Sequence, residues 1–149
     1  MIAKNNPFNI RYNALNRWLG LSGQRKGFCE FEEMDYGLRA GFILLRNYIY
    51  NLKLTSVNKI ISRFAPTNEN DTSAYIRFVS GVLVDNGFAP SYLYNTLDLS
   101  YDKAFFYLCK AILKMENNYA LTYMDFVLIC RKFNLHKHVS ISDENIEEA

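Results

Sequence analysis

One glutamate stands out as a group that can do acid–base chemistry. Glu116 ends an apolar stretch, Ala111 to Met115, and is followed directly by Asn117. A carboxyl group at the C-terminal end of a helix faces the negative end of the backbone dipole, and apolar neighbours remove water from it. Both effects disfavour ionisation, and a carboxylic acid that keeps its proton near neutral pH can protonate a glycosidic oxygen. The ordinary alternative is a solvated glutamate at a helix end.

Amide, guanidinium and indole groups gather near the N-terminus. Residues 5–11 read Asn-Asn-Pro-Phe-Asn-Ile-Arg, which places hydrogen-bond donors and acceptors at fixed positions on a turn-rich backbone. The indole of Trp18 can stack on the face of a sugar ring. The alternative is that the asparagines form turns and that Trp18 lies in the core. The residues that we expect to bind substrate in this region are Asn6, Asn9, Arg11 and Trp18.

A third polar cluster, Glu69 to Thr72 followed by Tyr75, lies where a helix is expected to begin. Asn70 and Asp71 are good N-cap residues, so helix capping explains the cluster without any function. The same spacing brings Asp71 and Tyr75 together as a rim for a cleft. We therefore include them among the substrate-binding candidates, whose remaining members are Arg39, Asn117 and Tyr119.

Composition excludes several other kinds of function. The chain has 149 residues, 50% of them hydrophobic, and a net charge of +2, which is too weak an imbalance to indicate nucleic acid binding. His136 and His138 have no cysteine or carboxylate partners at metal-ligand spacing. The sequence contains neither a glycine-rich phosphate loop nor a serine or cysteine nucleophile motif. We expect no cofactor and no metal.

The cysteines and the lack of a signal peptide indicate the cellular compartment in which the protein is expected to fold. Cys109 and Cys130 lie in apolar helical contexts and are expected to be free, buried thiols. We find no signal peptide and no segment of transmembrane length, and so expect synthesis in a host cytoplasm without membrane insertion. Action outside the cell would then require lysis, a holin or a virion to deliver the protein.

The elements that must position these groups are mainly helical. Residues 1–33 are expected to form an irregular arm and a small hairpin around Phe28 to Phe31. Apolar residues at helical spacing follow, and N-caps are expected at Thr55, Ser100 and, with Asp125, at Thr122. The predicted helices are an amphipathic helix over 34–52 and helices over 55–64, 71–86, 100–115 and 122–133. We predict one domain over residues 1–135 and a polar C-terminal tail over 136–149.

Several of these segments resemble a family of small phage and prophage proteins that are described as virion structural proteins. The match runs in order from about residue 5 to residue 120, with Phe8 in place of a usual glycine and Phe64 in place of a usual tryptophan. The motifs that carry it are Asn6 to Arg11, Trp18 to Gly20, Gly27 to Phe31, Tyr36 to Ala40, Tyr48, Ile60 to Pro66, Glu69 to Tyr75, and Glu116 with Asn117.

A second resemblance suggests an activity. The segment Asn-Pro-Phe-Asn-Ile, followed by a hairpin and a helix, is similar to the Asn-x-Phe-Gly-Ile segment of bacterial cell-wall glucosaminidases. In that lysozyme-like family the segment follows the helix that carries the catalytic glutamate. Only four residues precede Asn5, so the helix that ends at Glu116 takes that place from the other end of the chain. The resemblance implies a circularly permuted lysozyme-like fold with its cleft between Glu116 and residues 5–31.

These resemblances imply a glycosidase or lytic transglycosylase that acts on the glycan strands of peptidoglycan. Glu116 would be the general acid, and Glu30 or Glu32 on the hairpin would be a second carboxylate. A lytic transglycosylase does without the second carboxylate, because an internal sugar hydroxyl replaces water. The alternative is a non-catalytic virion structural protein or a cell-wall-binding protein of the same fold, with other virion proteins as partners. A host-takeover or adaptor protein is a third possibility.

Overall fold

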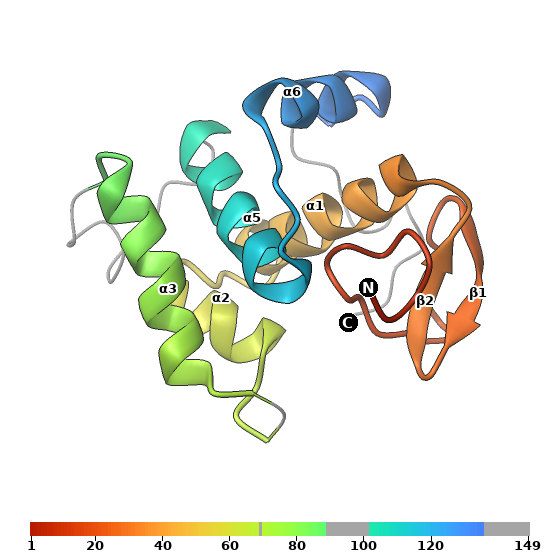
Figure 1. Ribbon diagram of the computed structural model, residues 1–149, viewed down its shortest axis with the longest axis horizontal. Helices are drawn as coiled ribbons and strands as arrows, with labels where there is room; N and C mark the ends of the chain where they lie inside the picture. The colour runs from red at the N-terminus through yellow and green to blue at the C-terminus, as the bar shows by residue number, and fades with distance from the viewer. Residues whose placement is uncertain (69, 89–101, 136–149) are drawn as a thin grey trace.

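The computed structural model describes residues 1–68, 70–88 and 102–135 (Figure 1). Within these ranges the chain forms one antiparallel hairpin and five α-helices, so the predicted mainly helical class with a small N-terminal hairpin is confirmed. Ser100 and the predicted tail over 136–149 lie outside the described residues. The elements are β1 (Leu21–Arg25), β2 (Phe28–Phe31), α1 (Met34–Tyr50), α2 (Val57–Phe64), α3 (Thr72–Asp85), α5 (Asp102–Asn117) and α6 (Tyr123–Lys132).

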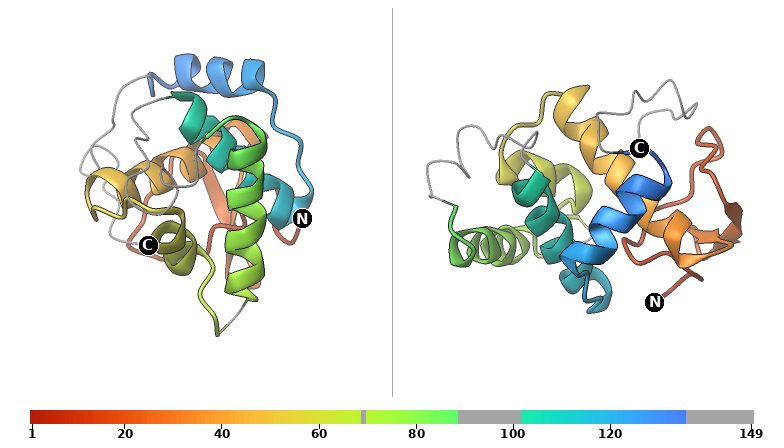
Figure 2. Two further views of the ribbon diagram at one scale, coloured as in Figure 1. Left: turned by 90° about the vertical axis from the view of Figure 1, so that its left-hand side faces the viewer. Right: turned by 90° about the horizontal axis from the view of Figure 1, so that it is seen from above.

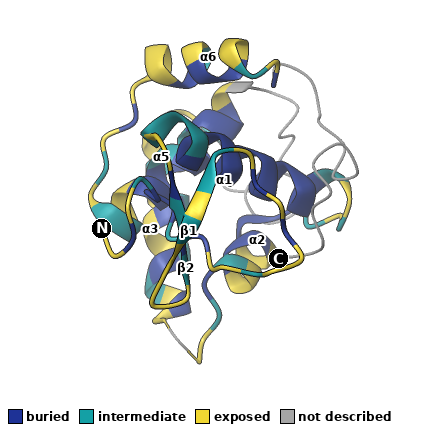
Figure 3. Cartoon of the chain, turned by 90° about the vertical axis from the view of Figure 1, so that its right-hand side faces the viewer, coloured by how far each residue is buried: buried dark blue, intermediate teal, exposed yellow. Residues whose placement is uncertain are grey.

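Helix α1 runs through the middle of the molecule, with the hairpin at one end and α2 and α3 at the other (Figures 1 and 2). Every residue from Gly37 to Ile49 is buried. The expectation of an amphipathic helix is therefore wrong for most of its length, since no face of this stretch is exposed and most of α1 is dark blue in Figure 3. Three polar residues of this stretch, Arg39, Arg46 and Asn47, are buried with the rest.

The buried arginines of α1 are accommodated by aromatic rings and by a backbone oxygen. The guanidinium of Arg46 lies 4.8 Å from the ring centroid of Phe105 and donates a hydrogen bond to the carbonyl oxygen of Leu135. The guanidinium of Arg39 lies 5.4 Å from the ring centroid of Phe133. A buried charge needs such partners, and these contacts connect α1 to α5 and to the end of α6.

The irregular N-terminal arm is ordered by hydrogen bonds to β2. The amides of Phe31 and Cys29 donate to the carbonyl oxygens of Lys4 (3.0 Å) and Ile10 (2.9 Å). The fully buried side chain of Asn6 donates to the carbonyl oxygens of Ile10 and Cys29 and accepts from the amide of Ile10. Asn6 thus replaces the missing backbone pairing, and residues 5–9 form a loop beside the end of α5.

Side-chain caps define where three of the helices begin. Asp71 and Thr122 each accept a hydrogen bond from the backbone amide three residues further on, as the sequence suggested. The cap of α2 is Ser56 and not Thr55, since the Ser56 hydroxyl makes the equivalent bond at 3.2 Å. The error is one residue, because two neighbouring hydroxyl residues compete for the same role.

The core contains the three thiols. Cys29, Cys109 and Cys130 are buried and free, which confirms the prediction for Cys109 and Cys130. Burial raises the pKa of the Cys29 thiol to about 11. Of the helices that the structure describes, none is long and apolar enough to cross a membrane.

Two glycines on one face of α1 allow the arm to approach the helix closely. A β-carbon at Gly37 would collide with the carbonyl oxygen of Asn5, and one at Gly41 would collide with the ring of Phe8. Phe8 is fully buried and packs edge-on against Phe42, with ring centroids 5.9 Å apart. The residue that departs from the phage-family pattern therefore fills the space above a glycine.

Substituting Gly41→Ala should destabilise the protein by about 1–3 kcal/mol or more, because the new methyl group displaces the Phe8 ring in a packed core. Gly81→Ala on α3 is the matched control. Apart from the backbone of its own helix and its two chain neighbours, nothing lies within 4 Å of the added carbon there, so the better helix propensity of alanine should stabilise the protein by up to about 1 kcal/mol. Urea unfolding measures both, and a Gly41→Ala variant as stable as wild type would contradict the packing described.

Candidate functional site

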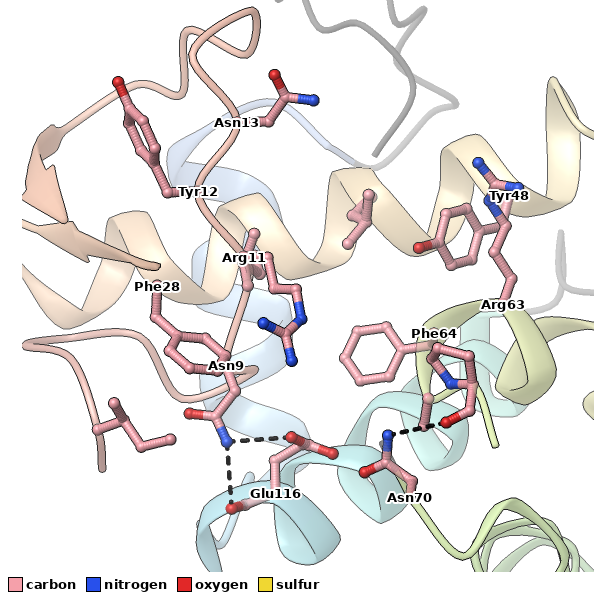
Figure 4. Close-up of a pocket in the computed structure, with 15 residues that line it drawn as sticks. Asn9, Arg11, Tyr12, Asn13, Phe28, Tyr48, Arg63, Phe64, Asn70 and Glu116 are labelled. Carbon is pink, nitrogen blue, oxygen red and sulfur yellow. Dashed lines mark hydrogen bonds between the residues drawn. The ribbon is translucent and has the colours of Figure 1, made fainter. Parts of the chain in front are cut away.

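Glu116 lies at the C-terminal end of α5, where two side chains from distant parts of the chain hold its carboxyl group. Figure 4 shows one of them, Asn9. The side-chain amide of Asn9 donates to Oε1 at 3.0 Å, and the hydroxyl of Tyr75 donates to Oε2 at 2.8 Å. The Asn9 amide also lies 3.5 Å from the backbone oxygen of Glu116. One oxygen is thus bound from the N-terminal arm and the other from α3, which fixes the orientation of the half-buried carboxyl group.

The neighbouring asparagines complete this arrangement. The side-chain amide of Asn117 donates to the carbonyl oxygen of Pro7 at 2.8 Å and to Oδ1 of Asn9 at 3.0 Å. Asn9 has φ +54° and Asn118 has φ +52°, a backbone region that asparagine tolerates better than most residues. The left-handed residues turn the arm back at Asn9 and end α5 at Asn118. Asn9 therefore both turns the backbone and binds Glu116, whereas Asn118 ends the helix and Asn117 binds the arm.

Tyr75 is a permanent hydrogen-bond donor to the site. Its side chain is 4% exposed. Burial raises the pKa of Tyr75 far above its ordinary value, and the neighbouring charge of Glu116 and the hydrogen bond to it act in the same direction. The hydroxyl keeps its proton at any working pH, and it can also accept a hydrogen bond when the carboxyl carries the proton.

The carboxyl group opens onto a pocket of about 540 Å³ between the N-terminal arm and the α2–α3 connection. Leu44 and Tyr48 of α1 contribute to its lining, as do Arg63 to Pro66 from the end of α2. Burial raises the pKa of Tyr48, although the charge of Arg63 and a hydrogen bond from it oppose that change. Among the described residues that line this pocket, Glu116 is the one acidic side chain.

The structure brings three of the predicted site residues to this pocket, Asn9, Arg11 and Glu116. Tyr75 and Asn117 do not line it but bind its lining residues. The guanidinium of Arg11 lies 4.9 Å from the ring centroid of Phe28, and Figure 4 shows both side chains in the pocket wall.

Several predicted substrate-binding residues occupy other places. Asn6 is fully buried and binds the backbone, and Trp18 and Arg39 are 4% and 6% exposed within the core. None of these three side chains is more than 6% exposed, so they offer little surface to a ligand. Asp71 caps α3, as the capping alternative described, and Tyr119 is half-buried after the end of α5.

The two hairpin carboxylates do not line the pocket. Glu30 is half-buried on β2, and its Oε2 accepts a hydrogen bond from the amide of Lys4 at 3.3 Å. Glu32 is exposed after the end of β2. Glu69, from the polar cluster before α3, lies outside the described residues.

The sequence pattern did not predict that residues of α2, of the α2–α3 connection and of a further part of the arm line the pocket. Arg63, Phe64 and Asn70 line it, together with Tyr12 and Asn13. Arg63 and Phe64 precede the Ala-Pro pair that ends α2, which was a signal that the chain leaves the helix at that point. Their position opposite the arm could not be found from that signal, because the contact joins segments about 50 residues apart.

The chain is similar to a known bacteriophage protein. It is 39% identical over 83 residues to Protein P5 of Pseudoalteromonas phage PM2, and the match covers 53% of this chain and 52% of that protein. The chain thus spans about half the length of the curated relative it matches. No protein-family model matches the chain. The similarity supports a bacteriophage origin, in agreement with the first resemblance drawn from the motifs.

Substituting Tyr75→Phe should destabilise the protein by about 1–3 kcal/mol, because it removes the donor to Oε2 of Glu116 and leaves the carboxylate without that partner. Tyr12→Phe is the matched control, since Tyr12 is 41% exposed and should change the free energy of unfolding by less than about 0.5 kcal/mol. Equal stability of both variants in urea unfolding would show that the Tyr75 hydroxyl does not hold Glu116.

Proposed function

We propose that the chain is a phage glycosidase that cleaves the glycan strands of peptidoglycan, with Glu116 as its general acid. The observation that carries this proposal is the placement of Glu116. It is the one acidic side chain among the described residues that line a pocket of about 540 Å³, and Asn9 and Tyr75 fix both of its oxygens. A positioned carboxyl group in a cleft with aromatic and amide walls suits acid catalysis on a sugar chain.

The chemistry follows from one carboxyl group that gives and then takes a proton. Protonated Glu116 donates to the glycosidic oxygen while the bond from that oxygen to the anomeric carbon breaks. An internal hydroxyl of the same sugar attacks the anomeric carbon, and its proton passes to the Glu116 carboxylate. The acid is thereby regenerated, and the product carries an internal anhydro ring. Tyr75 donates to the Glu116 carboxylate once its proton has passed to the glycosidic oxygen, and so stabilises that state.

We favour this route, a lytic transglycosylase reaction, over hydrolysis because Glu116 is the one acidic side chain among the described residues that line the pocket. Hydrolysis by retention or inversion uses a pair of carboxyl groups on either side of the scissile bond. Glu30 and Glu32, the expected partners, lie on the hairpin and not among the residues that line the pocket. With Glu116 as the single described acid there, a reaction that needs one carboxyl group fits better.

We extend the proposal to the architecture and the setting. The expected permuted lysozyme-like arrangement needs the loop of residues 5–9 beside the glutamate that ends a helix, and the 3.0 Å contact of Asn9 with Glu116 supports it. The similarity to a phage protein supports action in a phage context, either as part of a virion or after release to the cell wall. Peptidoglycan strands and other virion proteins are then the proposed partners.

A second candidate function is a non-catalytic virion protein or cell-wall-binding protein. The observation in its favour is that the hydrogen bonds around Glu116 also fasten both the arm and α3 to α5. A carboxylate with that structural role needs no catalytic one. In this case the pocket would bind glycan without cleaving it.

Substituting Glu116→Gln separates these functions. Glutamine keeps the shape and can accept from Asn9 while it donates to the Tyr75 hydroxyl, so the fold should be retained. Release of soluble fragments from purified peptidoglycan should fall by about 10²–10⁴-fold, the usual contribution of an acid–base group. Glu33→Gln, an exposed glutamate outside the pocket, is the matched control and should keep full activity.

Mass spectrometry of the fragments tests the route, because hydrolysis adds one water to each cleaved bond and transglycosylation adds none. Unchanged activity in Glu116→Gln would remove Glu116 as the acid. Inactive wild-type protein that still binds peptidoglycan would establish the non-catalytic function instead. Activity lost in Glu30→Gln or Glu32→Gln would bring back a two-carboxylate mechanism.

A further inference from the structure

The pocket beside Glu116 has a cationic side. Arg11 comes from the N-terminal arm and Arg63 from the end of α2, and both line the pocket. With Glu116 as the one acidic side chain among the described lining residues, the described lining has a formal excess of positive charge. Such a balance favours ligands that carry a negative charge.

Aromatic rings hold both guanidinium groups in place. Arg11 lies 4.9 Å from the ring centroid of Phe28, and Arg63 lies 5.4 Å from that of Tyr48. Tyr48 is 3% exposed on α1, so its ring is a fixed support. Stacking restricts a long side chain before a ligand binds, which lowers the entropy lost on binding.

The chemistry of these groups points to a carboxylate. A guanidinium presents five N–H donors in a planar fork, which matches the two oxygens of a carboxylate. A neutral hydroxyl of a sugar can use one or two of these donors, but it gains nothing from the charge. Figure 4 shows the guanidinium of Arg11 directed toward the centre of the pocket, and Arg63 on the opposite wall.

We infer that Arg11 and Arg63 select a glycan that carries free carboxylate groups over a neutral glycan of the same shape. In peptidoglycan such a group is the carboxylate of the lactyl ether on the muramic acid residue, once the stem peptide has been removed. This inference deepens the proposed function and rests on the pocket being a glycan site. It makes the preferred substrate a peptide-free strand.

The test measures binding and not cleavage. The Glu116→Gln protein is titrated in a calorimeter with a peptidoglycan tetrasaccharide that carries free lactyl carboxylates. It is titrated next with the same tetrasaccharide after conversion of those carboxylates to primary amides. The two ligands differ in charge and hardly in shape. The free acid should bind about tenfold or more tightly than the amide, and the preference should weaken as salt is added.

Arginine variants in the same background assign the preference to residues. Arg63→Gln and Arg11→Gln should each reduce the preference for the acid by about threefold or more, while affinity for the amide changes less than twofold. Arg63→Lys should keep part of the preference because it keeps the charge. Arg77→Gln on α3, an exposed arginine that does not line the pocket, is the matched control and should keep the whole preference. Melting temperatures verify that each variant is folded.

The outcomes distinguish this inference from the proposed function. Equal affinity for both ligands, or an equal loss for both in the arginine variants, overturns the inference even if wild-type protein cleaves peptidoglycan. A preference for the acid that depends on Arg11 and Arg63 supports the inference even if wild-type protein cleaves nothing. Failure of both ligands to bind overturns the inference, because the pocket is then not a glycan site.

Discussion

The hydrogen bonds that converge on Glu116 join three parts of the chain. Asn9 is 107 residues from Glu116 in sequence, and Tyr75 is 41 residues from it. Each contact is short, and together they hold the arm, α3 and the end of α5 at one point. A buried or half-buried carboxylate is costly without partners, so this arrangement tolerates little displacement of any of the three segments. The shape of the pocket depends on these bonds, because the arm and Glu116 line it and Tyr75 of α3 holds Glu116 in place.

The arm can take this position only because two glycines of α1 leave room for it beside the helix. Gly37 and Gly41 lie one helical turn apart and leave room for the backbone of Asn5 and the ring of Phe8. Asn6 then supplies the hydrogen bonds that a regular strand would have supplied to the backbone of Ile10 and Cys29. These hydrogen bonds hold an irregular segment in place, and Asn9 reaches Glu116 from that segment.

Two residues of this site both stabilise the fold and bind the carboxyl group of Glu116. Asn9 turns the backbone with its positive φ and donates to Glu116, and Tyr75 packs in the core while its hydroxyl donates to the same carboxyl group. Arg11 and Arg63 differ from these, since both are exposed, and they stack on rings at the pocket wall. Residues that fix the carboxyl group are therefore separate from residues that can recognise a charged ligand.

The sequence by itself determined the class of the fold and the placement of Glu116 at a helix end. Helical periodicity and capping residues act over a few neighbours, so α2, α3 and α6 begin within about two residues of their predicted starts.

Only the tertiary structure decided which polar side chains reach the pocket. Trp18 and Arg39 are the kinds of residue that bind sugars, yet both are buried, while Arg63 lines the pocket opposite the arm. The reason is that burial and proximity depend on contacts between distant segments, such as the arm on α1, and local pattern carries no information about them. For Glu116 the sequence supplied a carboxyl group at a helix end, and the fold supplied Asn9, Tyr75 and the pocket in front of it.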